Sequence, residues 1–320
     1  MAEQVKNGKA FEFALAETYY DSIKNLGVPV VLHQDKQYDN CKECLGSFDK
    51  DAKNRFKMSA LVTVDTLFKL EPGLFADTNQ NNPINIRIAK DEEGRNGDVR
   101  DVIVYRDSPS WTIGFSAKNN NDAVKHSRLS AILDFGKEWL NVPVSKQYWS
   151  DIEPIFGMID NIQKRNPDTT WDDLGQKKEL EIYVPLLEAF RKELLCIYEN
   201  NDKVPQKLIS YLIGRYPFYK IIKDDTHNLV IVKAYNIEGG LNKTVNGEKA
   251  RYKTPKINLP TRIVEFERHN STNTLYMILD GGWEISFRIH NASTKLERSL
   301  KFDIRLLGNP PILFTQHIFQ

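Results

Sequence analysis

An acid and a lysine stand at the ends of two neighbouring β-like runs in the middle of the chain. Asp101 directly precedes the run 102–105, and Lys118 ends the run 111–118. Turn residues between the runs predict a hairpin, in which the start of the first strand lies beside the end of the second. A carboxylate there can hold a divalent cation, and an ammonium group can orient or activate the water that attacks phosphorus. The pair predicts a metal-dependent phosphodiesterase site; the alternative is a plain hairpin with solvated ends.

Alternation along the second run decides which side chains accompany Lys118. A period of two places Gly114 and Ser116 on the face of the lysine, and we expect Gly114 to leave open space beside it. Asp98 is a second acid before the first strand. Residues three apart in an extended chain face opposite ways, so Asp98 and Asp101 are not expected to bind one ion together. Asp98 could equally be a turn residue.

Longer segments around these residues resemble a known family. They are 97–104 (GDVRDVIV), 111–130 (WTIGFSAKNNNDAVKHSRLS), 134–140 (DFGKEWL) and 281–304 (GGWEISFRIHNASTKLERSLKFDI), with a shorter match at 8–13 (GKAFEF). The sequence resembles the HaeIII-type restriction endonucleases of the PD-(D/E)XK nuclease superfamily. The resemblance implies a Mg²⁺-dependent type II restriction endonuclease that hydrolyses phosphodiester bonds of double-stranded DNA in the middle of the palindrome GGCC. It also suggests a homodimer, at least on DNA, because a palindromic target suits two active sites related by a two-fold axis.

The resemblance gives roles to the residues of the hairpin. Lys118 is the motif lysine, and Asp101 stands where the aspartate of the superfamily usually does. The motif has an acid two residues before the lysine, whereas this chain has Ser116, and a hydroxyl is a poor ligand for a hard cation beside a carboxylate. Either the site works with fewer protein ligands and more water, or another acid takes that place. The catalytic candidates are Asp101, Lys118, Asp98 and Ser116.

Three acids are candidates to replace the missing one. In this superfamily the first helix often lends a glutamate to the metal, which favours Glu12 in the helix predicted over 9–26; its alternative role is stabilisation of the helix start. Asp122 is second, because it follows the motif lysine closely, although aspartate is also a favoured helix cap. Asp134 is third, because a helix over 122–140 would carry it away from the strand end. The metal candidates are therefore Asp101, Glu12 and Asp122.

Two polar clusters could contact DNA. Arginine and lysine read guanine edges, asparagine reads adenine, and serine, threonine and lysine also suit phosphates. The alternative is a capped helix start for the first cluster and a polar loop for the second. The first cluster comprises Asn119, Asn121, Lys125, His126, Ser127 and Arg128, and the second comprises Arg288, His290, Asn291, Ser293, Thr294 and Lys295.

The pattern of the whole chain predicts a mixed α/β fold with flanking helices and a β-rich C-terminal region. The resemblance implies that its core is PD-(D/E)XK-like. We expect a nuclease core with a helical insert over 1–200, a linker at 199–205, and a DNA-recognition region over 205–320. The polar stretch 236–258 is expected to be a mobile loop. The predicted helices cover 9–26, 54–70, 122–140, 147–165 and 171–199, and the predicted strands cover 84–89, 102–105, 111–118, 218–222, 229–234, 261–267, 275–279, 283–289, 300–306 and 312–318.

Composition is that of an ordinary globular protein. The 320 residues carry a net charge of only +1, so any affinity for DNA must come from local patches. No apolar run approaches the ~20 residues of a membrane span, and the N-terminus lacks a signal-peptide core, which predicts a cytoplasmic protein without membrane contact. No nucleotide-binding fingerprint occurs, so no nucleotide cofactor is expected. Cys41 and Cys44 form a lone CxxC, for which free thiols are favoured over zinc.

Two other functions compete with a GGCC-cutting endonuclease. One is a nuclease of the same fold with another target. The other is a nuclease-fold DNA-binding protein that has lost catalysis, which Ser116 keeps open.

Overall fold

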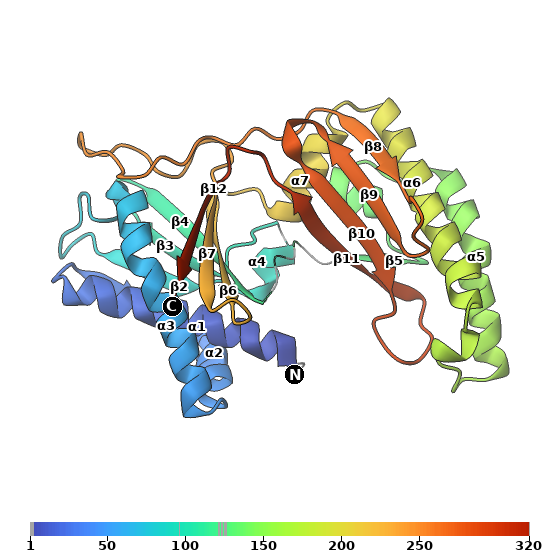
Figure 1. Cartoon of the computed structure of the whole chain (residues 1–320), viewed down its shortest axis with the longest axis horizontal. Helices are drawn as coiled ribbons and strands as arrows, with labels where there is room; N and C mark the ends of the chain where they lie inside the picture. Colours follow the sequence, from blue (N-terminus) through green and yellow to red (C-terminus); the bar gives the residue numbers. More distant parts are fainter. Residues whose placement is uncertain (1–2, 96, 121, 123, 125–126, 320) are drawn as a thin grey trace. The chain divides into compact units, whose positions relative to one another are not determined.

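The chain forms two compact units, shown in Figure 1. A computed structural model describes residues 3–95, 97–120, 122, 124 and 127–319. The first unit combines Met1–Asp122, Gly214–Asn258 and Ile312–Gln320, and the second combines Ala123–Ile213 and Leu259–Pro311. Each unit has its own sheet and its own helices, so the mixed α/β class predicted from the sequence is confirmed.

The first unit is built on a seven-stranded sheet with the order β1-β2-β3-β4-β6-β7-β12. The pairs β1–β2 and β4–β6 are parallel, and the other neighbours are antiparallel. β3 and β4 are the predicted hairpin, and the parallel pairing of β4 with β6 requires a long crossover. The strands are β1 Val30–Leu32, β2 Ile84–Ile88, β3 Val102–Arg106, β4 Trp111–Asn119, β6 Phe218–Asp224, β7 Leu229–Tyr235 and β12 Phe314–Phe319.

Helices cover one face of this sheet. The predicted apolar positions of the first helix are buried, and the Tyr19 ring lies 4.8 Å from the Phe115 ring of β4. Ile113, Phe115 and Ala117 point into this core, so alternation leaves Ser116 and Lys118 on the opposite face of β4. The helical segments of this unit are α1 Glu3–Asn25, α2 Lys36–Gly46, α3 Lys50–Leu70, the 3₁₀ turn η1 Pro72–Leu74 and α4 Asp91–Arg95.

The second unit packs helices on a five-stranded antiparallel sheet with the order β5-β11-β10-β9-β8. Its core is aromatic: the Phe190 ring lies 4.8 Å from Phe135 and 5.0 Å from Phe302. The strands are β5 Ser127–Ser130, β8 Ile263–Glu267, β9 Thr274–Leu279, β10 Glu284–His290 and β11 Ser299–Gly308. The helical segments are η2 Gly136–Leu140, α5 Lys146–Arg165, η3 Asp172–Leu174, η4 Lys178–Tyr183, α6 Val184–Glu199, α7 Val204–Ile213 and η5 Asp280–Gly282.

The closing helix predicted over 122–140 is wrong. Residues 127–130 form β5, which pairs with β11 through Leu129 opposite Leu300, and residues 136–140 form a short π-helix. Four residues of alternation are a weak local signal, and the partner strand lies far along the sequence, so the pairing could not be read from this segment alone.

The division of the chain also differs from the predicted one. The seven β-like runs expected after residue 216 all form strands, but β6, β7 and β12 join the sheet of the first unit. The segment expected as a linker at 199–205 lies within the second unit, where it spans the end of α6, a short connection and the start of α7. Strand pairing, which sequence texture does not reveal, decides which runs belong together.

Segment 236–258, expected to be a mobile loop, is fixed to the first unit by buried amides. The side chain of Asn236 donates to the Thr254 carbonyl at 2.7 Å and accepts from the Leu241 N–H at 2.9 Å. The side chain of Asn242 donates to the carbonyls of Leu70 at 2.6 Å and Tyr252 at 2.8 Å. Asparagine amides therefore supply the bonds that a regular strand ladder would provide.

None of the helices in the described ranges combines the length and the apolar character that a membrane crossing needs.

Candidate active site

The Asp101 carboxylate meets Lys118 at the end of β4. Its Oδ2 accepts a hydrogen bond from the Ala117 N–H at 2.7 Å, from the Ser116 hydroxyl at 3.3 Å and from the Lys118 ammonium group at 3.5 Å. The backbone N–H of Asp101 donates to the Phe115 carbonyl at 2.7 Å, which sets the register of this end of the hairpin. The side chains of Asp101 and Lys118 are 26% and 28% exposed, so both can reach a substrate.

Glu12 of α1 belongs to the same electrostatic environment. Burial, and then the negative charge of Asp101, raise the pKa of Glu12 to about 8, while the cations Lys9 and Lys118 act in the opposite direction. The thiol of Cys41 donates to Glu12 at 3.6 Å. Because α1 begins at Glu3, the alternative role of Glu12 at a helix start is wrong.

The two carboxylates fit a hard divalent cation. The charge of Asp101 disfavours the charged form of Glu12, and a bound cation would favour that form. Carboxylate oxygens are also the ligands that Mg²⁺ prefers. Asp101 and Glu12 are therefore residues that could hold such an ion.

Asp122 is bound by two lysines of neighbouring strands. Lys220 of β6 and Lys233 of β7 both form ion pairs with its carboxylate, and the Lys220 ammonium also donates to the Asp122 carbonyl at 3.1 Å. Burial alone would raise the pKa of Asp122, but the two ammonium groups hold it below its usual value. The side chain of Lys220 is only 4% exposed. Lys220 lies opposite Ser116 in the register of β4 and β6.

Asp98 and Arg100 form a local pair beside the hairpin. The guanidinium of Arg100 donates to both carboxylate oxygens of Asp98, at 2.8 and 2.7 Å. The expectation of open space next to Gly114 is wrong, because the Arg100 side chain fills it: a Cβ at Gly114 would lie 2.1 Å from Arg100 Cδ. Gly114 is thus required for the close approach of Arg100.

The third acid considered, Asp134, lies in the second unit. One of its oxygens accepts from the backbone N–H groups of Lys137 at 2.8 Å and Val144 at 3.1 Å. It therefore caps the turn that contains η2.

The first polar cluster is divided by the fold. Asn119 is half-buried at the end of β4 in the first unit, whereas Ser127 and Arg128 belong to β5 in the second. Ser127 is buried and shares a hydrogen bond of 3.3 Å with Tyr211, which disfavours a contact with DNA; Arg128 is exposed and donates to Ser299 at 3.2 Å. The helix start considered for this cluster is absent, because residues 127–130 form β5. Asn121, Lys125 and His126 lie outside the described residues.

The second polar cluster begins on β10 and continues into a folded loop. Asn291 donates to the Ser293 carbonyl at 2.7 Å, and Ser293 donates to the Lys295 carbonyl at 2.8 Å. His290 bonds the Asn291 carbonyl at 2.9 Å, and Lys295 pairs with Asp168 at 2.9 Å. The Thr294 carbonyl accepts from the Trp171 N–H at 3.0 Å. Arg288 is exposed on β10, and within the described residues it takes part in no ion pair.

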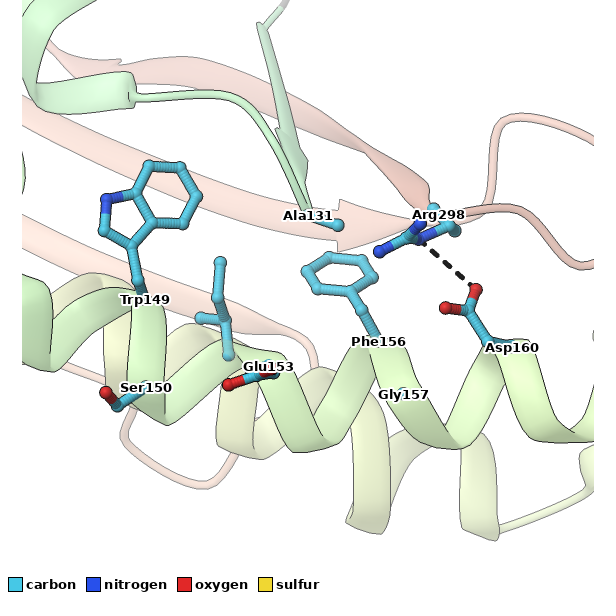
Figure 2. Close-up of a pocket in the computed structure, with 9 residues that line it drawn as sticks. Ala131, Trp149, Ser150, Glu153, Phe156, Gly157, Asp160 and Arg298 are labelled. Atoms are coloured by element: carbon cyan, nitrogen blue, oxygen red, sulfur yellow. Dashed lines mark ion pairs between the residues drawn. The ribbon is translucent and has the colours of Figure 1, made fainter.

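Two further features of the second unit involve none of the predicted site residues. The first is a cavity of about 410 Å³ lined mainly by α5, with Trp149 and Phe156 among its residues. Figure 2 shows Phe156 beside the ion pair of Arg298 with Asp160. The second feature is an exposed group that could hold a metal ion: Glu265, Glu267 and His269.

Sequence reasoning missed Lys220, Lys233 and the role of Arg100. Lys220 and Lys233 lie far from the hairpin along the sequence, and only the pairing of β6 with β4 brings them to Asp122. The Asp98–Arg100 pair was visible as a short spacing, but its position over Gly114 depends on the hairpin register.

The chain belongs to a family of restriction endonucleases. The family model described as HaeIII restriction endonuclease matches residues 8–310. The type II restriction enzyme HaeIII of Haemophilus aegyptius is 38% identical over 306 residues, which cover 95% of this chain and 94% of that protein. No solved structure gives a significant match. The family expected from the sequence is confirmed, and with it the class of enzyme, a site-specific deoxyribonuclease.

Proposed function

We propose that this chain is a type II restriction endonuclease that hydrolyses phosphodiester bonds of double-stranded DNA at the palindrome GGCC, with Mg²⁺ as its cofactor. The observation that carries the proposal is the contact of Lys118 with Asp101 at the end of β4, beside the Glu12 carboxylate. The similarity to the HaeIII enzyme runs along nearly the whole chain, which supports the same type of target.

Asp101 and Glu12 are the residues that we assign to the metal. A bound Mg²⁺ supplies positive charge to the phosphate and a water of lowered pKa. The N–H of Ala117 fixes the Asp101 carboxylate, and the hydrogen bonds that described residues donate to this carboxylate all end on Oδ2. We therefore assign the other oxygen, Oδ1, to the ion.

Glu12 is a better candidate for the second acid than Asp122. The charge of Asp122 is already balanced by Lys220 and Lys233, so a metal ion there would compete with two ammonium groups. Glu12 has Asp101 as a neighbour of like charge, which favours binding of a cation.

Lys118 is the residue that we assign to the transition state. Its ammonium group lies at the exposed strand end, where it can stabilise the charge that develops on the attacked phosphate. Ser116 then has a supporting role, because its hydroxyl donates to Asp101.

For recognition, we assign a base contact to Arg288. An exposed arginine without an ion-pair partner in the described part of the chain can bind the O6 and N7 atoms of guanine. A palindromic target favours a homodimer on DNA, with one active site for each strand. We place the enzyme in the cytoplasm, where it would meet DNA.

The test is incubation of the protein with plasmid DNA and Mg²⁺. Discrete fragments that end within GGCC, and none without Mg²⁺, support the proposal. Discrete fragments with other ends would mean another target. A shift of the DNA without cleavage would favour the alternative of a DNA-binding protein that has lost catalysis, for which Ser116 in place of an acid is the argument.

A further inference from the structure

Segment 243–256 of the first unit, which we call the basic loop, concentrates positive charge. It carries five cations and one acid, Glu248, hence a net charge of +4, whereas the whole chain has +1. The remainder of the chain is therefore negative, and an affinity for phosphate must depend on local surfaces of this kind. The cations are Lys243, Lys249, Arg251, Lys253 and Lys256, and all five are exposed.

The cations of the basic loop are available to a partner. No ion pair within the described ranges involves any of them, although acids such as Glu248 and Asp77 belong to the same part of the unit. Most exposed lysines in proteins are simply solvated, so the charge by itself decides little. What distinguishes this loop is its backbone.

The backbone of the basic loop is fixed before any partner arrives. The carboxylate of buried Glu71 accepts from the N–H of Asn242 at 2.8 Å, and the Lys69 carbonyl accepts from the N–H of Arg251 at 2.9 Å. A tight turn at Asn246 and Gly247, both with positive φ, joins Val245 to Glu248 by two backbone bonds of 3.1 and 2.9 Å. Binding would therefore order only the side chains, which lowers its entropic cost.

The loop lies toward the beginning of β4, whereas Lys118 lies at its end. Gly73 lies against both Trp111, the first residue of β4, and Val245 of the loop: a Cβ at Gly73 would be 2.7 Å and 3.2 Å from their side chains. Lys118 is seven positions after Trp111, which is about 23 Å of strand at ~3.3 Å per residue. At ~3.4 Å per base pair this corresponds to roughly seven base pairs of duplex.

We propose that the basic loop binds the phosphate backbone of the substrate DNA outside the short recognition site. The proposal rests on the proposed function, since it takes double-stranded DNA as the partner. It adds a contact that reads no sequence but increases affinity and salt dependence for long duplexes.

The experiment measures binding to a 12-bp and a 30-bp duplex, each with a central GGCC, between 50 and 200 mM salt. Lys118→Met is present throughout, so that the DNA is not cut. The loop variant changes the five cations to Gln. A matched control changes five exposed cations of α2 and α3 to Gln, which removes the same charge: Lys36, Lys42, Lys50, Arg55 and Lys57.

We expect the loop variant to lose tenfold or more in affinity for the 30-bp duplex, and the magnitude of its salt slope to fall by about 0.9 for each lost phosphate contact. Affinity for the 12-bp duplex should stay within twofold. If the control variant loses as much affinity as the loop variant, net charge explains the effect and the proposal is overturned. If the loop variant loses as much affinity for the 12-bp duplex as for the 30-bp duplex, the basic loop does not bind outside the recognition site. If the Lys118→Met protein with an unchanged basic loop binds neither duplex, the proposed function fails. If it binds and the loop variant binds equally well, only the proposal for the basic loop fails.

Discussion

Lys220 of β6 lies opposite Ser116 of β4, so a buried ammonium group stands one strand away from the position where the expected motif acid is missing. The carboxylate of Asp122 binds this ammonium group and that of Lys233. Two cations and one anion leave a net positive charge in the sheet near Lys118. Phosphate would therefore be attracted to this strand end.

Lys220→Met should slow cleavage at least tenfold and lower the free energy of unfolding by roughly 1–3 kcal/mol, because Asp122 would keep only Lys233 as a partner. Single-turnover cleavage and urea unfolding measure the two effects. Arg106→Met is the control: Arg106 is also a buried cation of this sheet, but it lies at the far end of β3. Equal cleavage rates for both variants would show that Lys220 is only structural.

Lys118→Met should reduce the cleavage rate a hundredfold or more and leave DNA affinity within a few-fold. The ammonium group is assigned to charge that develops only in the transition state, so its loss should not weaken ground-state binding. Single-turnover cleavage and equilibrium binding are measured on the same duplex. Activity within tenfold of wild type would contradict the assignment.

Glu12→Gln and Asp122→Asn should behave differently toward the metal. Glu12→Gln should lose activity that added Mg²⁺ partly restores, because one of two assigned oxygen ligands is lost. Asp122→Asn should instead lose roughly 1–3 kcal/mol of stability, because it leaves buried Lys220 and half-buried Lys233 without their anion, and its Mg²⁺ requirement should be unchanged. The cleavage rate of each variant is measured against Mg²⁺ concentration. If Mg²⁺ restores activity to Asp122→Asn and not to Glu12→Gln, Asp122 is the metal ligand and Glu12 is not.

Arg288→Ala should weaken binding of GGCC duplexes by roughly 1–3 kcal/mol while binding of unrelated DNA changes little, if this arginine reads a guanine. Arg305→Ala is the matched control, because Arg305 is exposed on the neighbouring strand β11 but pairs with Asp303. Equal weakening on both DNAs would mean a phosphate contact, with a salt slope reduced by about one. No change on either DNA would place recognition elsewhere.

Glu71 should make stability depend on pH. Burial raises the pKa of Glu71 to about 7, although the hydrogen bonds from Tyr219 and Asn242 act to lower it. A raised pKa means that the folded state favours the protonated form, so this contribution is full below about pH 4.5 and is lost as pH rises through about 7. Glu71→Gln, which keeps an acceptor oxygen, should therefore match wild type at pH 5 and unfold at a higher temperature at pH 8.5. The same difference in melting temperature between Glu71→Gln and wild type at both pH values would contradict this prediction.

The Asp101–Lys118 pair could be predicted because the hairpin that creates it is local. β3 and β4 are adjacent in sequence, alternation decides which face each residue takes, and the antiparallel register follows from a short connection. The buried face of α1 and the seven later strands were predictable for the same reason, since each needs only the period of its own residues.

The tertiary structure decided the surroundings of that pair. Lys220 and Lys233 reach Asp122 only because β6 pairs in parallel with β4 across a long crossover, and no local pattern encodes that choice. Arg100 fills the space over Gly114, and Ser127 is buried beside Tyr211 in a strand whose partner is far along the chain. Residue types and periods are properties of the sequence, whereas long-range pairing depends on the packing energy of the whole unit. The pair of Asp101 and Lys118 could therefore be predicted, whereas the two lysines that bind Asp122 could not.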